Sequence, residues 1–155
     1  MTQREREQEA RRHLYRYAQD RREIEEYEQS VFGSPKHDES GIRGSGISDP
    51  TARLGVALAE PPQRLEHKRR WIAAIDDALD ELRQTDVDAH GLAYICTRIY
   101  GLDGRRHKRR ENRDASIKVA LDCHLSVRAL YYRLGIITNV VIAHAAERGC
   151  FEEKK

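Results

Sequence analysis

The clearest pattern of apolar and polar positions lies in the C-terminal third of the chain. Apolar side chains recur there at steps of four, three, four and four, at Leu130, Leu134, Ile137, Val141 and Ala145. This spacing places them on one face of an α-helix. The β-branched residues of the same stretch continue this stripe and do not alternate as they would in a strand. The pattern therefore predicts a long helix with one buried face.

The residues before this stripe predict a shorter helix and a tight turn. Ala120 is a small residue at the point where the next helix would cross, and Leu125 is an apolar residue in the turn. Ser126 can accept a hydrogen bond from the first free amides of the second helix, so it is the predicted N-cap. Residues 114–149 are therefore a candidate helix-turn-helix, whose second helix would enter the DNA major groove. A plain helical hairpin would show the same pattern and stays open as the alternative.

The N-terminal segment predicts another long helix, because residues 2–31 contain no proline or glycine. Its apolar seam is interrupted by Arg21 and is spaced almost as heptads; its members are Ala10, Leu14, Tyr17, Ile24 and Val31. One interpretation is a solvated helix packed on its own domain. The other is a coiled-coil arm that pairs with a second copy, as a homodimer through this helix, or with another protein.

Shorter helices are expected between these two segments. Residues 33–50 contain four glycines, four serines and two prolines, which indicates a flexible linker. Helical spacing then predicts helices over 52–60, 63–82 and 86–100, with Trp71 as a core anchor and Gly101 as a C-terminal cap. No segment predicts a strand. The expected fold is all-α, with an N-terminal helix over 1–32, the linker over 33–50 and a helical bundle over 51–155.

Charge is segregated along the chain although its total is small. The 155 residues carry a formal net charge of +2, which does not by itself indicate a nucleic-acid partner. Residues 76–90, however, hold six acids and one base, whereas residues 98–113 hold seven bases and two acids. Such segregation creates strong local fields. Because the basic run leads directly into the candidate helix-turn-helix, we expect it to contact DNA; a solvated loop is the alternative.

Chemistry other than binding has little support in the sequence. The seven histidines are scattered, and the three cysteines lack the spacing of a zinc site. Cys123 and His124 could pair as a nucleophile and base, but Cys123 is expected to face the core. We therefore expect no catalysis, no metal and no cofactor. An odd number of widely spaced cysteines fits free thiols in a reducing cytosol.

Neither a membrane nor an export route is expected. The chain contains no run of about 18 apolar residues, so the sequence predicts no membrane span. The polar N-terminus, MTQREREQEARR, has no apolar segment of the kind found in secretory signals. The expected location is the cytoplasm.

DNA binding divides the candidate residues by role. Arg128 lies in the first turn of the second helix, where its guanidinium can donate two hydrogen bonds to a guanine edge. Tyr131, Tyr132 and Arg133 follow as further base contacts, and core packing is the alternative for either tyrosine. The expected phosphate contacts are Arg105, Arg106, Lys108, Arg109, Arg110, Arg113, Lys118 and Ser126. Because these contacts depend on charge, binding should weaken steeply with salt.

Four segments in this order carry a family resemblance. They are ISDPTA at 47–52, WIAAIDDALDEL at 71–82, ICTRIYG at 95–101 and the stretch 125–147. Together they resemble the RinA/ArpU type of phage late-gene transcription regulators, and the Asp-Pro-Thr-Ala step after the linker is the most particular mark. The resemblance implies a helix-turn-helix like that of sigma factor region 4, in a cytoplasmic protein of the bacterial host. Such a protein would bind double-stranded DNA, activate late promoters and contact RNA polymerase.

The chain departs from this family in several places, and two other functions stay open. The family has an aromatic-rich start to its helix-turn-helix where this chain has ASIKVA at 115–120, and residues 129–133 align in two registers. One alternative function is a small terminase subunit that binds packaging-site DNA as an oligomeric ring. The other is a sigma-like RNA polymerase adaptor that would use the acidic helix 76–82 and the N-terminal helix to bind polymerase.

Overall fold

The computed structural model describes residues 1–32, 62–85, 90–105 and 112–151. Over these ranges the chain forms α1 (Gln3–Phe32), α3 (Gln63–Thr85), α4 (Leu92–Tyr100), α5 (Asn112–Asp122) and α6 (Val127–Glu147), and no strand. The predicted all-α fold is therefore confirmed for the described part of the chain. The predicted linker over 33–50, the predicted helix over 52–60 and residues 106–111 of the basic run lie outside it.

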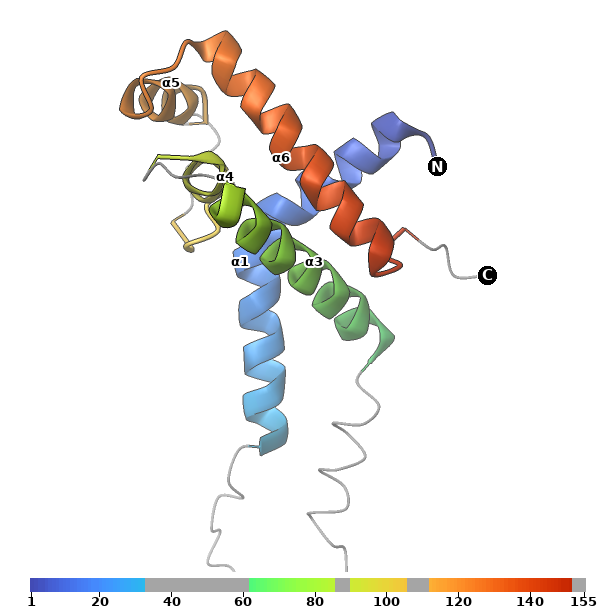
Figure 1. Cartoon of the computed structure of the whole chain (residues 1–155). Coiled ribbons are helices and arrows are strands. Elements are labelled where there is room, and N and C mark those ends of the chain that lie inside the picture. Colours follow the sequence, from blue (N-terminus) through green and yellow to red (C-terminus); the bar gives the residue numbers. More distant parts are fainter. Residues whose placement is uncertain (33–61, 86–89, 106–111, 152–155) are drawn as a thin grey trace, which may run out of the picture.

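Three long helices form the centre of the molecule. α3 packs against α6, and α1 packs against both of them. Figure 1 shows α6 running from α5, at one end of the molecule, toward the C-terminus, with α1 crossing it. The short helix α4 lies against α3, α5 and α6, so it connects the central helices to the end that carries α5.

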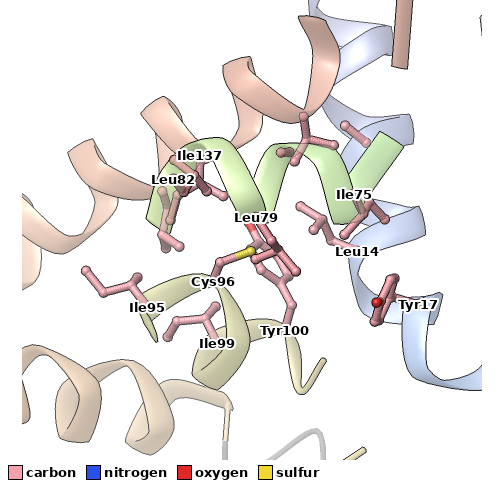
Figure 2. Close-up of a cluster of buried hydrophobic side chains, with 14 of the residues drawn as sticks. Leu14, Tyr17, Ile75, Leu79, Leu82, Ile95, Cys96, Ile99, Tyr100 and Ile137 are labelled. Atoms are coloured by element: carbon pink, nitrogen blue, oxygen red, sulfur yellow. The ribbon is translucent and has the colours of Figure 1, made fainter. Parts of the chain in front are cut away.

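The apolar faces predicted from spacing meet in one core. All five members of the C-terminal stripe are buried, and Trp71 has an exposed fraction of only 1%, which confirms it as a core anchor. Figure 2 shows Ile75 and Leu79 of α3 beside Leu14 of α1 and Cys96 of α4. Each such side chain, when fully buried, stabilises the fold by about 1.5–3 kcal/mol.

The apolar seam of α1 belongs to this same core. Ala10, Leu14, Tyr17 and Ile24 are buried, whereas Arg21 stays exposed and donates a hydrogen bond to the Tyr17 hydroxyl at 3.0 Å. Packing of this helix on its own domain is the interpretation that burial supports. The last member of the seam, Val31, is only half-buried, and a homodimer through the buried part of the seam would have to open the core.

Backbone hydrogen bonds close the turn between α5 and α6. The Leu125 amide donates to the Ala120 carbonyl at 2.8 Å, and the His124 amide donates to the Leu121 carbonyl at 3.1 Å. His124 has a φ of 54°, in the left-handed region that such helix ends usually give to glycine. Ser126 caps α6 as predicted, because its hydroxyl accepts a hydrogen bond from the Ala129 amide at 3.1 Å. A short helix, a tight turn and a long helix thus occupy the predicted positions.

α4 begins later than its apolar spacing predicted. Its first residue is Leu92, with Gly91 before it as N-cap, instead of a residue near 86; residues 86–89 lie outside the described ranges. Its end is as predicted, because Gly101 adopts a φ of 64°. A side chain at Gly101 would also collide with the Arg105 carbonyl oxygen, only 2.7 Å from an added Cβ. Both observations explain glycine at this position.

One described helix, α6, is long and apolar enough by length and composition to cross a membrane. Its apolar residues include Leu130, Ile137 and Val141, which are buried in the core of this chain. A core helix of a soluble protein has the same properties, so this observation does not indicate a membrane protein.

Candidate nucleic-acid interface

The first two turns of α6 expose the side chains that point away from the core. Arg128 is exposed, and the exposed fractions of Tyr131 and Tyr132 are 60% and 73%. Neither tyrosine packs in the core. Gly135 continues this open side, because a Cβ added there would meet nothing within 4 Å. α6 therefore buries one face and leaves the other open at its N-terminal end, as a helix that enters a DNA groove must.

Arg133 lies on a different side of α6 from Tyr132. It is half-buried, and its charge acts on Cys123 in the turn before α6. Burial raises the pKa of the Cys123 thiol, and Asp122 raises it further, whereas Arg133 lowers it. Arg133 is thus placed beside the turn instead of on the outermost side of the helix.

Three of the expected phosphate contacts are described in full. Lys118 is exposed on α5, the helix that packs against α6. Arg105 is also exposed, and its Nε lies 3.7 Å from Oδ2 of Asp103, a spacing that leaves the guanidinium largely solvated. Ser126 is exposed, but its hydroxyl is already engaged as the cap of α6.

The remaining expected phosphate contacts cannot be placed in the fold. Arg106, Lys108, Arg109 and Arg110 lie outside the described residues. Arg113 falls within α5, but its side chain lies outside what the structure describes.

One side chain of α1, Tyr15, interacts electrostatically with Tyr131 of α6, although nothing in the sequence pattern singled it out. The Tyr15 ring packs edge-to-face on Tyr100, with 4.8 Å between the ring centroids. Burial raises the pKa of the Tyr15 hydroxyl; nearby Arg11 lowers it and Tyr131 raises it. The sequence signal that could have found this side chain is its type: Tyr15 is an aromatic residue that lies outside the apolar seam of a highly charged helix.

The acidic residues of α3 are engaged within the chain. The Arg148 Nε donates to Asp77 at 2.7 Å, and the His144 Nε2 lies 2.6 Å from a Glu81 carboxylate oxygen. Asp80 pairs with Arg83 at 3.0 Å, and Asp76 accepts a hydrogen bond from the Tyr17 hydroxyl. These carboxylates therefore hold α3 against α1 and α6 or pair along α3 itself.

The cysteines are further side chains that could carry chemistry, and two of the three are buried. The cysteines at 96, 123 and 150 are free thiols, and burial raises the pKa of Cys96 to about 12 and that of Cys150 to about 11. Both buried thiols are therefore protonated and poorly nucleophilic at neutral pH. Among the described residues, no group of three or more His, Cys, Asp or Glu side chains is arranged to hold a metal ion.

The open end of α6 thus offers a guanidinium and two phenol rings on successive turns, and α5, which packs against α6, carries an exposed lysine. Guanidinium and hydroxyl donors are suited to base edges and to phosphate oxygens. Comparisons with family models, with curated proteins and with solved structures found no significant match to the chain, so this surface carries the argument for function.

Proposed function

We propose that the protein is a DNA-binding activator of phage late genes, of the RinA/ArpU type, in which α5 and α6 form the helix-turn-helix. The observation that carries this proposal is the exposure of Arg128 and Tyr132 on the first turns of α6, while the opposite face of the same helix is buried. A helix held in this way is rigid and presents its N-terminal end outward. That is the geometry by which a recognition helix enters the major groove.

The side chains divide into two roles. Arg128 donates two hydrogen bonds to a guanine edge, and Tyr131 and Tyr132 contact neighbouring bases or sugars. Lys118 and Arg105 contact phosphates on either side of the groove, together with the basic residues 106–113. The positive end of the α6 dipole adds to the attraction for the DNA backbone.

The proposed location is the cytoplasm of the bacterial host, where the protein would act with RNA polymerase. The adaptor alternative is less well supported, because it depends on the acidic face of residues 76–82. The carboxylates of Asp76, Asp77, Asp80 and Glu81 all have partners in this chain, which leaves them less available to a second protein.

The substitution Arg128→Ala tests base reading. Selection of bound duplexes from a random pool first supplies the preferred sequence. On that sequence, we expect the variant to lose about 1–3 kcal/mol of binding free energy, since a bidentate guanine contact is worth about that much. Titrations with the selected and with a random duplex measure the loss on each.

The matched control is Arg12→Ala, which removes an exposed arginine from α1 and should leave the preference between the two duplexes unchanged. Equal losses on both duplexes for Arg128→Ala would show that Arg128 does not read bases. If the unmodified chain binds no duplex, the proposed function is wrong.

A further inference from the structure

The charges of α1 are separated by side, although the helix has almost no net charge. Its carboxylates at the α3 contact form ion pairs with cations of α3, at distances of 2.7–2.8 Å: Asp20 with Lys68, Glu23 with Arg64 and Glu28 with Arg69. These three acids therefore lie on the side of α1 that faces α3. The arginines are divided: Arg12 and Arg16 also border α3, whereas Arg4, Arg11 and Arg22 lie on another side of the helix.

One exposed side of α1 carries no acid over most of its length. Its members recur at steps of four, three, four, four and three, so they form one stripe along the helix. We call them the α1 stripe; all are exposed, and they are Arg4, Gln8, Arg11, Tyr15, Gln19 and Arg22. Three are cations and the others are neutral donors or acceptors, while Glu26, one turn after Arg22, bounds the stripe.

The α1 stripe lies between two parts of the proposed DNA surface. At its middle, the Tyr15 ring packs edge-to-face on Tyr100 of α4, a helix that lies against α6, and α1 itself packs against α6. Near its end, Gln19 and Arg22 line a hollow of about 500 Å³ together with Gly104, Glu23 and Glu26. Arg105, the first residue of the basic run, follows Gly104 directly. The stripe therefore connects the exposed end of α6 with the start of the basic run.

We propose that the α1 stripe is a second nucleic-acid contact, which binds the phosphate backbone of the duplex that α6 enters. Guanidinium, amide and phenol groups are the side-chain donors that contact phosphate oxygens, and they do so without regard to base sequence. No position of the stripe is a carboxylate before Glu26, which lies with Glu23 in the hollow that Arg22 also lines. This inference rests on the proposed function, because it assumes a duplex at the open end of α6.

The salt dependence of binding by the full chain to a random-sequence duplex tests the α1 stripe. The double substitution Arg11→Gln and Arg22→Gln removes two stripe cations. We expect the slope of log K against log salt to become shallower by about 1.8, about 0.9 for each lost phosphate contact. Affinity at low salt should fall at least about tenfold, because each contact releases counterions.

The matched control is Arg12→Gln with Arg16→Gln, which removes the same charge from the same helix on the side that borders α3. Its slope should stay at that of the unmodified chain. The further variant Arg11→Lys with Arg22→Lys should retain the original slope, because phosphate contact needs the charge. Far-ultraviolet circular dichroism and the thermal midpoint establish that each variant is folded, as expected for exposed positions.

The outcomes separate this inference from the proposed function. The α1 stripe does not contact the phosphate backbone if the stripe variant keeps the original salt slope, or if the slope of the control variant becomes shallower by the same amount. Either result leaves the proposed binding of DNA by α6 unaffected. If the unmodified chain binds no duplex, both proposals fail.

Discussion

His13 is buried between α1 and α3 although its side chain can carry a charge. Its ring stacks on Trp71, with 4.2 Å between the centroids and an angle of 9° between the planes. The Trp71 Nε1 in turn donates to the His67 Nε2 at 3.2 Å. Burial lowers the pKa of His13 to about 4, and the nearby Glu9 opposes this change only in part. The neutral imidazole therefore serves as an aromatic core residue.

This burial makes stability depend on pH. In the unfolded chain a histidine has a pKa of about 6.5, so between about pH 6.5 and 4 the unfolded state binds a proton that the folded state excludes. The contribution of neutral His13 is complete above pH 6.5 and is lost as the pH falls toward 4. We expect a loss of about 2–3 kcal/mol in the free energy of unfolding. Denaturant titrations at pH 7 and at pH 4.5 measure it.

Comparison with His13→Phe isolates this residue from the other titrating groups. The phenyl ring keeps the stacking on Trp71 and cannot take up a proton, so this variant should lose less stability on acidification. The exposed His90 gives the control, since His90→Gln should keep the pH dependence of the unmodified chain. An unchanged pH dependence in His13→Phe would contradict the account of His13.

At the scale of helices, a buried ion pair joins α1 to α3. The Lys68 Nζ lies 2.8 Å from Asp20 Oδ1, and the exposed fractions of the two side chains are 11% and 4%. Both charges have left water, so their attraction compensates a large desolvation cost. The pair specifies how α1 lies on α3, because the Asp20 carboxylate is buried against Lys68, which also pairs with Glu23 of α1.

Removing one partner of this pair should therefore lower the free energy of unfolding more than removing both. We expect Lys68→Met to lower the free energy of unfolding by about 3 kcal/mol, because it leaves the Asp20 carboxylate buried without its cation. Adding Asp20→Leu to this variant should recover most of the loss. Denaturant unfolding monitored by circular dichroism gives both values.

The exposed pair of Arg12 and Glu9 supplies the control for this experiment, since surface pairs contribute little. Arg12→Met should change stability by no more than about 0.5 kcal/mol. A double variant no more stable than Lys68→Met alone would show that the ion pair is not what couples α1 to α3.

Over the whole molecule, one core unites all of the described helices. Ala10, Leu14 and Tyr17 of the α1 seam lie in this core, and the acids of α3 are engaged with α1, with α6 or along α3 itself. The N-terminal end of α6, Lys118 on α5 and the α1 stripe are all exposed. These are the positions that the proposed DNA contact uses.

The mass in solution distinguishes the proposed activator from a packaging ring. The chain has a mass of 18.0 kDa, and light scattering should give that value or twice that value. We expect the lower value, because most of the seam that could have joined copies through α1 is buried inside one chain; the higher value would indicate a dimer through another surface. A mass corresponding to many copies would instead favour a small terminase subunit.

The sequence by itself determined the local structure of this protein. Helical spacing located the buried face of α6 at Leu130 to Ala145, and the side-chain chemistry of Ser126 and Gly101 located the ends of helices. These features depend on interactions between residues a few positions apart. The boundary predicted near residue 86 was wrong: α4 begins at Leu92, the first residue of its apolar stripe, directly after its N-cap Gly91.

Only the tertiary structure decided how the helices use their surfaces. The seam of α1 would look the same in a coiled-coil arm, and burial against α3 and α6 decided between the two. Core packing was open in the sequence for Tyr131 and, less so, for Tyr132, and the structure shows that both are exposed. The side of α1 that faces α3 is likewise known only from residues such as Lys68, which lie far along the chain and pair with its acids. Which helix faces are buried and which charges are paired depends on how helices that are distant in the sequence pack together. Local spacing does not contain this information.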